Sequence, residues 1–251
     1  QFYVPEAEEP SYRIAGGTQA VIDALLKRLS GQDIRLSAKV TAIKNNEKGI
    51  IVEMANGTTL QGGQVVVCIP PQLAPTQIEF TPSLPNDLKV ILPTVQTWMA
   101  GAIKFTLEYA EPFWRKKGFS GMLYSHADIA VEMYDHTNIK EDKYGFTGFL
   151  NGGAAGFSQE VRKANVLRQL SELFGNEAGQ PTAYYDKVWN DQYIIEGGAI
   201  IEPPHQNNGH PVLQMDYLNG KLLFCGTETA SQFPGYMEGA VDAAIRVANK
   251  F

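Results

Sequence analysis

Residues 221–251 read KLLFCGTETASQFPGYMEGAVDAAIRVANKF, and this stretch decides the fold. The apolar run up to Cys225 predicts a strand, the glycines after it predict a turn, and residues 235–250 predict a helix. A strand that turns through glycine into a helix presents unpaired backbone N–H groups and the positive end of the helix dipole. Such a place suits an anion or an electron-rich ring, although connections without any ligand share the pattern.

Two more helices are expected outside this stretch. Residues 16–31 place apolar side chains at helical spacing between a Gly-Gly-Thr start and a Ser-Gly stop. Residues 158–175 repeat an apolar stripe, with Ser158 as N-cap and Gly175 beyond the last turn. A shorter helix is expected near Leu88.

Strands are expected between these helices. Residues 34–42 alternate apolar and polar side chains, and residues 50–60 turn back through Asn56-Gly57, a dipeptide typical of hairpins. The run QVVVCIPP (64–71) is apolar on both faces and ends at Pro70-Pro71, which predicts a central strand. The stretches WMAGAIKFTLEY (98–109), GMLYSH (121–126) and YGFTGFL (144–150) predict an antiparallel sheet, so the fold class is α+β.

Composition excludes several kinds of protein. A net charge of −6 with scattered Lys and Arg argues against nucleic acid as a partner. No apolar stretch approaches the roughly 20 residues of a membrane helix, and a cytoplasmic location is expected. Cys68 and Cys225 are expected to be two buried thiols. No metal is expected, because the histidines lack ligand spacing: His126, His136, His205 and His210.

The stretch GTETASQFPGYMEGAVDAA (226–244) resembles the C-terminal flavin signature of the monoamine oxidase family. Further segments resemble that family in the same order and cover almost the whole chain: RIAGGTQAVIDALLKRL, RLSAKVTAI, VVVCIPPQL, EPFWRKKGF and VWNDQY. The resemblance implies an FAD-dependent amine oxidase that converts a small-molecule amine to an imine and reduces O2 to H2O2. A homodimer is one candidate assembly.

The resemblance also implies a domain arrangement. Residues 1–72 and 205–251 would form part of an FAD-binding domain, and residues 73–204 a substrate-binding domain. No GxGxxG follows a strand, and NGGAAG (151–156) has the wrong glycine spacing, so the pyrophosphate cradle of the family is not found here. We therefore expect these 251 residues, taken alone, to be an inactive fragment without FAD.

Three residues are implied to act on the amine. Lys104 matches the lysine that holds a water against the flavin, although the pattern of its strand also fits an outward-facing lysine. Tyr236 matches one of two tyrosines that enclose the amine, and Trp189 matches a tryptophan near the flavin. Ile200 stands where the second tyrosine is expected, and Ala199 where some members carry the flavin-linking cysteine, so FAD should be noncovalent.

Other residues are implied to contact FAD. Val40 would meet the adenine through its backbone, Glu228 would lie near the ribityl and phosphate groups, and Met237 would offer its backbone N–H to the flavin. Gly226 opens the turn beside them. Three carboxylates could neutralise a second amine of a diamine substrate: Glu132, Glu196 and Glu202.

Two alternatives stay open at this stage. One is a related flavoprotein that oxidises amino acids or other substrates; the lysine at position 104 disfavours a porphyrinogen oxidase. The other is a noncatalytic folded module, because the segment that holds the ADP moiety is not in these residues.

Overall fold

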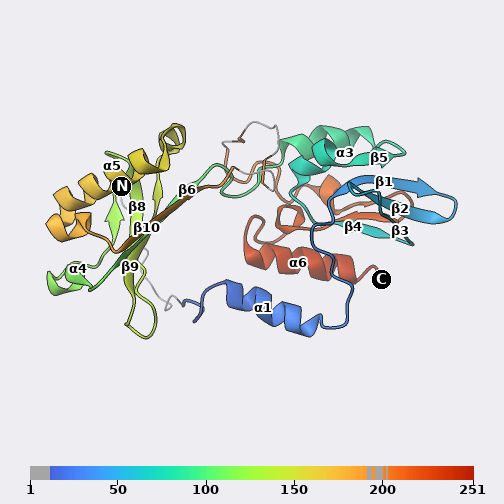
Figure 1. Ribbon diagram of the computed structural model, residues 1–251. Helices are drawn as coiled ribbons and strands as arrows, with labels where there is room; N and C mark the ends of the chain where they lie inside the picture. Colours follow the sequence, from blue (N-terminus) through green and yellow to red (C-terminus); the bar gives the residue numbers. More distant parts are fainter. Residues whose placement is uncertain (1–11, 191–193, 196–199, 202) are drawn as a thin grey trace.

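The structure, a computed structural model, describes residues 12–190, 194–195, 200–201 and 203–251. Two lobes lie side by side and are joined by a few crossing segments (Figure 1). We call them the mixed-sheet lobe and the antiparallel lobe. The combination of helices with a separate antiparallel sheet confirms the predicted α+β class.

The mixed-sheet lobe contains two small sheets. One has the strand order β3-β2-β1-β5 and the other β11-β12-β4. β5 runs parallel to β1, and β4 runs parallel to β12. Its elements are α1 (Gln19–Arg28), β1 (Val40–Asn46), β2 (Gly49–Met54), β3 (Thr59–Gly62), β4 (Val65–Val67), α2 (Ala74–Gln77), β5 (Glu79–Thr81), α3 (Asn86–Ile91), β11 (Asp216–Tyr217), β12 (Leu222–Phe224) and α6 (Met237–Ala248).

The predicted hairpin at Asn56-Gly57 is confirmed. β2 and β3 pair antiparallel up to Glu53 and Thr59, and Gly57 has a φ of +82°. The strand expected from residue 34 is shorter than predicted, because β1 begins only at Val40. Ser37 has a φ of 56°, a left-handed conformation that interrupts an extended chain before the strand starts.

The run around β4 was expected to be a central strand, and this expectation is wrong for the described residues. β4 lies at the edge of its three-stranded sheet, with only β12 beside it. Val65 and Val66 are half-buried, so both faces of the strand are apolar as the sequence indicates. An apolar pattern reports which faces are covered, but it does not report which edges are paired.

The antiparallel lobe is built on one five-stranded sheet with the order β10-β6-β9-β8-β7. Every neighbouring pair in it is antiparallel, as the sequence predicted. Its elements are β6 (Ile103–Tyr109), α4 (Phe113–Lys116), β7 (Leu123–Tyr124), β8 (Ala130–Asp135), β9 (Tyr144–Leu150), α5 (Gln159–Phe174) and β10 (Ala183–Val188).

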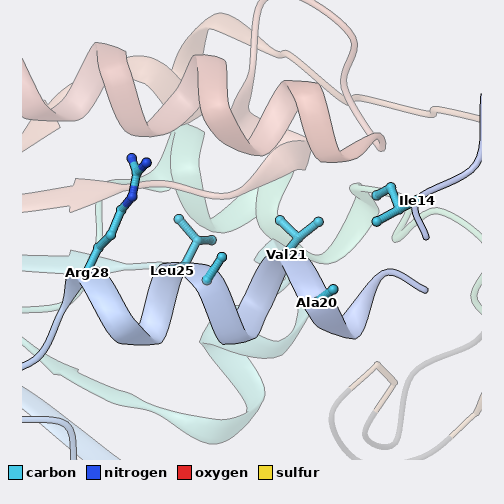
Figure 2. A pocket seen from close by; sticks show the side chains of 6 residues that line it. Ile14, Ala20, Val21, Leu25 and Arg28 are labelled. Atoms are coloured by element: carbon cyan, nitrogen blue, oxygen red, sulfur yellow. The ribbon is translucent and has the colours of Figure 1, made fainter. Parts of the chain in front are cut away.

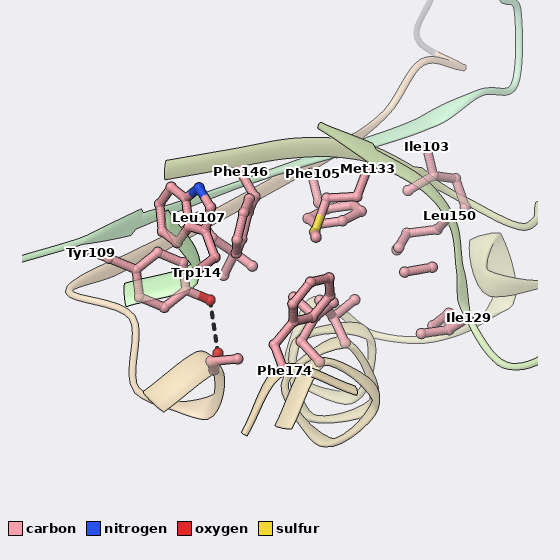
Figure 3. Packing of buried hydrophobic residues seen from close by; sticks show 14 of the residues in the cluster. Ile103, Phe105, Leu107, Tyr109, Trp114, Ile129, Met133, Phe146, Leu150 and Phe174 are labelled. Atoms are coloured by element: carbon pink, nitrogen blue, oxygen red, sulfur yellow. Dashed lines mark hydrogen bonds between the residues drawn. The ribbon is translucent and has the colours of Figure 1, made fainter. Parts of the chain in front are cut away.

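One face of this sheet packs against α5 and forms the core of the lobe (Figure 3). Phe105 and Phe146 come from the sheet and Phe174 from the helix, while Trp114 of α4 is fully buried. The buried Tyr109 donates a hydrogen bond of 2.7 Å to the carbonyl of Ala178. Because side chains alternate along a strand, the residues between these core positions lie on the opposite face, which we call the open face.

The two lobes have separate cores. The largest core of the mixed-sheet lobe joins residues from 43–95 with residues from 213–224, including Ile43, Leu88 and Phe224. The core of the antiparallel lobe joins residues 103–178. Packing therefore groups the core residues between 74 and 95 with the mixed-sheet lobe. The roles assigned to the two domains stay a prediction.

The helices predicted at residues 16–31 and 158–175 both form, but their apolar faces pack differently. In α5, the side chain of Ser158 accepts a hydrogen bond from the N–H of Val161, and Gly175 follows the last turn with a φ of +100°, as expected. In α1, no residue is buried, and the large apolar side chains of Ile22, Leu25 and Leu26 are exposed. Ile14, Val21, Leu25 and neighbouring residues line a cavity of about 340 Å³ beside this helix (Figure 2).

The two cysteines have different environments. Both are free thiols; Cys225 is buried and Cys68 is exposed, so the expectation of two buried thiols is wrong for Cys68. Cys68 follows the edge strand β4, which leaves it without a neighbouring strand on one side.

Of the helices in the described part of the chain, none is long and apolar enough to cross a membrane.

Candidate functional site

The predicted strand, turn and helix are present at residues 222–248. β12 ends at Phe224, Gly226 has a φ of +134°, and Gly235 has a φ of +88° just before α6 begins. Both glycines therefore occupy conformations that other residues rarely adopt. The first N–H groups of α6, starting with Met237, have no partner within the helix. The start of α6 therefore offers backbone hydrogen-bond donors directly after the turn.

Close packing holds the turn against the first residues of α6. A Cβ atom on Gly239 would lie 2.3 Å from the carbonyl oxygen of Phe233, so the backbones meet there without a side chain between them. The hydroxyl of Thr227 donates a 2.6 Å hydrogen bond to the carbonyl of Tyr236. The helix start and the turn are therefore packed directly against each other and joined by a hydrogen bond.

Glu228 lies beneath this turn as a buried carboxyl group, with 5% of its surface exposed. Burial raises its pKa. Among the described residues it has no ion-pair partner. A Cβ on Gly226 would be 3.6 Å from its Oε2, an ordinary contact distance, so the backbone of this glycine lies directly beside the carboxyl group. A buried carboxyl without a cation suits a ligand rich in hydroxyl groups.

Val40 opens β1, and its side chain is partly buried against the core of the mixed-sheet lobe. Its side chain is therefore occupied by packing. The contact of its backbone with a cofactor stays a prediction.

Tyr236 is half-exposed at the start of α6 and stands beside two aromatic rings that the sequence analysis did not single out. Its ring centroid is 5.9 Å from His205 and 5.7 Å from Trp98. His205 and Trp98 are themselves stacked, with centroids 4.4 Å apart. The aromatic neighbours of Tyr236 are therefore His205 and Trp98, whereas the position of the expected second tyrosine holds Ile200.

Hydrogen bonds fix the loop that carries His205 to the segment before β6. The backbone N–H of His205 donates to Oε1 of Gln96 at 2.5 Å, and Gln96 donates its own N–H to the carbonyl of Gln206 at 3.0 Å. Asn208 donates to the carbonyl of Gln96 at 2.7 Å. The Nδ1 atom of His205 is buried and has no hydrogen-bond partner in the described residues. The ring is thus held in place with one polar atom unused.

Lys104 lies on the open face of the antiparallel sheet and is exposed. It pairs across the strands with Lys187 of β10 and with Phe149 of β9, and its Nζ lies 5.7 Å from the centre of the Phe149 ring. The outward-facing orientation that the strand pattern allowed is therefore observed in this chain. Whether that face carries the chemistry stays a prediction.

Trp189 follows β10 on the same face. Lys187 lies over its ring, with Nζ 4.5 Å from the centroid. Gly101 donates a 2.7 Å hydrogen bond to the carbonyl of Trp189, and Trp189 donates one of 2.9 Å to the carbonyl of Ala102. The tryptophan is thus tied to the residues that lead into β6 and Lys104.

The segment 98–104 links the two groups of predicted site residues. Trp98 contacts Tyr236 in the mixed-sheet lobe, and Lys104 stands on the open face of the other lobe. Gly226, Glu228 and Met237 belong with Tyr236, whereas Trp189 belongs with Lys104. The fold therefore joins residues from distant parts of the sequence through one short connection.

The residues around the missing second tyrosine are only partly described. Ile200 packs on Gly101, since a Cβ on that glycine would lie 2.6 Å from its Cδ1. The predictions that involve Ala199, Glu196 and Glu202 fall outside the described residues. In the part of the chain that the structure describes, no group of three His, Cys, Asp or Glu side chains is arranged to hold a metal ion.

Trp98, His205 and Phe149 were missed as site residues because no local motif surrounds them. A single aromatic residue in a sequence is most often part of a core. The run of polar amides QNN after His205 was the one available signal, since a loop rich in such residues can be fixed by side-chain hydrogen bonds.

Comparison with known proteins agrees with the resemblance. A family model described as flavin containing amine oxidoreductase matches residues 2–250. The probable flavin-containing monoamine oxidase A of Dictyostelium discoideum is 30% identical over 248 residues, which cover 95% of this chain and 52% of that protein. The flavin-containing amine oxidase B of Mus musculus is 32% identical over 247 residues, with 95% and 46% covered.

Solved structures give the same result. Putrescine oxidase bound to putrescine superposes with a TM-score of 0.78 and 26% identity, over 95% of this chain and 53% of that one. Cyclohexylamine oxidase from Brevibacterium oxydans has a TM-score of 0.80 and 26% identity, over 93% and 52%. The chain spans about half the length of the relatives that it matches. Because the family model covers nearly all of it, the chain belongs to the flavin-containing amine oxidoreductase family.

Proposed function

We propose that the intact protein oxidises a small-molecule amine to an imine, which water converts to an aldehyde and ammonia, while O2 becomes H2O2. The observation that carries the proposal is the connection between Tyr236 and Lys104 through residues 98–104. When bound, FAD supplies the two-electron chemistry, and the protein supplies orientation and electrostatics.

The residues of the strand, turn and helix fit such a cofactor. Gly226 lies beside the buried carboxyl of Glu228, and the N–H groups at the start of α6, beginning with Met237, suit a ring that gains negative charge. The backbone of Val40 would contact the adenine of the cofactor. We propose that the cofactor is held without a covalent bond, because alanine at position 199 has no sulfur to form one.

The remaining site residues would bind the amine and position it for oxidation. Tyr236 offers the face of its ring, which attracts a substrate nitrogen through the ring quadrupole. Lys104 would hold a water molecule and help to move a proton at the reacting carbon or at oxygen. Trp189, tied to the start of β6, would shape the wall between them.

The test uses the full-length protein with its flavin. Anaerobic addition of butylamine, benzylamine or putrescine should bleach the flavin absorbance, and admission of air should restore it with release of H2O2. A Tyr236→Ala variant should bleach more slowly while its flavin content stays the same. Flavin that stays oxidised with every amine of a broad panel would overturn the proposal.

A further inference from the structure

The two cysteines lie side by side on neighbouring strands, although they are far apart in the sequence. β4 and β12 run parallel, and their pairing ends with Val67 opposite Phe224, so Cys68 and Cys225 come next on the two chains. The N–H of Cys225 donates a 2.9 Å hydrogen bond to the carbonyl of Val67, and a Cβ on Gly226 would lie 3.6 Å from the carbonyl oxygen of Cys68. The two chains therefore stay adjacent through both cysteines.

Both thiols project to the side of the sheet that α6 covers. Leu223 and Cys225 pack with Ala243 of α6 in one small apolar core, and Val66 of β4 packs on the same core. Because side chains alternate along a strand, Cys68 faces the same side as Val66, two residues earlier. The thiol of Cys225 is in hydrogen-bonding contact with that of Cys68. The fold thus builds a pair of thiols from two distant segments.

The spacing of the strands fits a single ion between the two sulfur atoms. Neighbouring strands lie about 4.8 Å apart, and paired side chains on one face stay close to that distance. A metal–thiolate bond is about 2.3 Å long in zinc sites, so an ion in line between two sulfur atoms spans about 4.6 Å. Rotation about the two Cα–Cβ bonds adjusts the remaining difference.

The thiol pair is reachable from one side and apolar on the other. Cys225 is buried, whereas Cys68 is exposed beside the edge strand β4. Partial burial of the Cys68 thiol and the nearby thiol of Cys225 raise the pKa of Cys68 to about 11, so this thiol keeps its proton at neutral pH. Because the thiolate is the form that attacks an oxidant, the pair is slow to oxidise and stays available as two thiols.

We propose that Cys68 and Cys225 bind one soft metal ion, Cu(I), between their sulfur atoms. Thiolates select soft ions such as Cu(I). An ion that prefers four ligands, such as zinc, is disfavoured, because the described residues contain no group of three His, Cys, Asp or Glu side chains arranged for a metal. The binding step forms two copper–sulfur bonds, releases two thiol protons to solvent and leaves copper as Cu(I).

This metal site does not depend on amine oxidation. The expectation of no metal considered ligands at short spacing in the sequence, and this pair arises only from the pairing of β4 with β12.

The experiment follows transfer of Cu(I) from its coloured bicinchoninate complex to the intact protein without oxygen, after its thiols have been reduced and the reductant removed. The colour falls as the protein takes up the ion. Wild type should take up about one ion per chain more than Cys68→Ser or Cys225→Ala, because in-line coordination needs both sulfur atoms. Cysteines elsewhere in the intact protein contribute equally to every variant, so the difference reports this pair.

A matched control and a second measurement separate binding from folding. Gln64→Ser changes an exposed residue just before β4 and keeps both thiols, so it should take up Cu(I) as wild type does. Cu(I) should raise the melting temperature of wild type and of Gln64→Ser but not of the two cysteine variants, because a ligand stabilises the folded state that binds it. Melting without metal checks each fold, and the exposed Cys68→Ser keeps the test valid if Cys225→Ala loses stability.

Equal uptake of Cu(I) by wild type and both cysteine variants overturns the proposal, and so does a loss in only one of two folded variants. A third outcome against it is a disulfide in the protein as purified. In that case reduction would add two titratable thiols to wild type but not to Cys68→Ser.

Discussion

The imidazole ring of His205 lies flat against the indole ring of Trp98, with centroids 4.4 Å apart and planes inclined by 14°. Gly235 makes this contact with α6 close, because a Cβ there would lie 3.2 Å from the imidazole and from Cβ of Trp98. The stack therefore stands against the helix start that carries Tyr236. In this chain an aromatic support for Tyr236 comes from a loop histidine and a tryptophan before β6.

We predict that His205 positions the ring of Tyr236. His205→Ala in the intact enzyme should raise KM for amines several-fold with unchanged flavin content, since stacked rings contribute about 0.5–1.5 kcal/mol. His205→Phe should restore KM, because it rebuilds the stack without the imidazole nitrogens. Steady-state kinetics of both variants provide the measurement. If phenylalanine is no better than alanine, stacking is not the role of this residue.

We predict that Lys104 affects kinetics more than folding, because it is exposed and packs into no core. Lys104→Met should slow flavin reduction or reoxidation by roughly 10²- to 10⁴-fold, the range for a lost proton-transfer group. Stopped-flow absorbance follows both half-reactions. Lys187→Met, on the same row one strand away, is the matched control. Rates within about threefold of wild type, under about 1 kcal/mol of barrier, would refute the role.

We predict that FAD leaves the intact protein when it is denatured by acid, since Ala199 has no sulfur. After precipitation, the yellow colour should appear in the supernatant, and the pellet should show no flavin fluorescence. Flavin that stays attached to the polypeptide would contradict this expectation and would point to another residue as the link.

We predict that the 251 residues, expressed on their own, bind no stoichiometric FAD. The GxGxxG segment that gives most donors to a pyrophosphate is not among them. Absorbance of the purified chain at the flavin band, relative to its protein band, measures the content. One FAD per chain would show that the strand, turn and helix at 222–248 suffice to hold the cofactor.

We predict an acid-sensitive contact at Asp135, which joins β8 to α4. Burial alone would raise the pKa of this carboxyl, but hydrogen bonds from Arg115, Thr137 and Trp114 lower it from 3.8 to about 2. A lowered pKa in the folded state means that the stabilisation is present above about pH 4 and is lost as the pH falls toward 2. It corresponds to about 2 kcal/mol.

Asp135→Asn should therefore lower the melting temperature clearly at neutral pH and much less at about pH 2, where about half of the wild-type carboxyl groups are protonated and most of the stabilisation is lost. Thermal unfolding followed by circular dichroism at several pH values measures the difference. A difference that does not shrink on acidification would show that shape, and not charge, sets the contribution of this residue.

Local patterns in the sequence were sufficient for several parts of the molecule. The hairpin at Gly57, the capped helix at residues 159–174 and the glycine turn before α6 depend on neighbours a few residues apart, and all three are present. The strands at residues 130–135 and 183–188 were not predicted. Each carries two charged residues without a regular alternation, Glu132 and Asp135 in the first and Asp186 and Lys187 in the second, and they become strands by pairing with β9 and β6.

The amino-acid order therefore identifies the family, the fold class and the strand, turn and helix, because residue types at short spacing carry that information. Three relations could not be predicted from it: the edge position of β4, the alignment of Glu132 with Lys104 across the strands, and the stacking of His205 on Trp98. Those relations depend on which strands pair and which loops meet. They arise from contacts between residues far apart in the chain, whose free energy exists only once the lobes have folded.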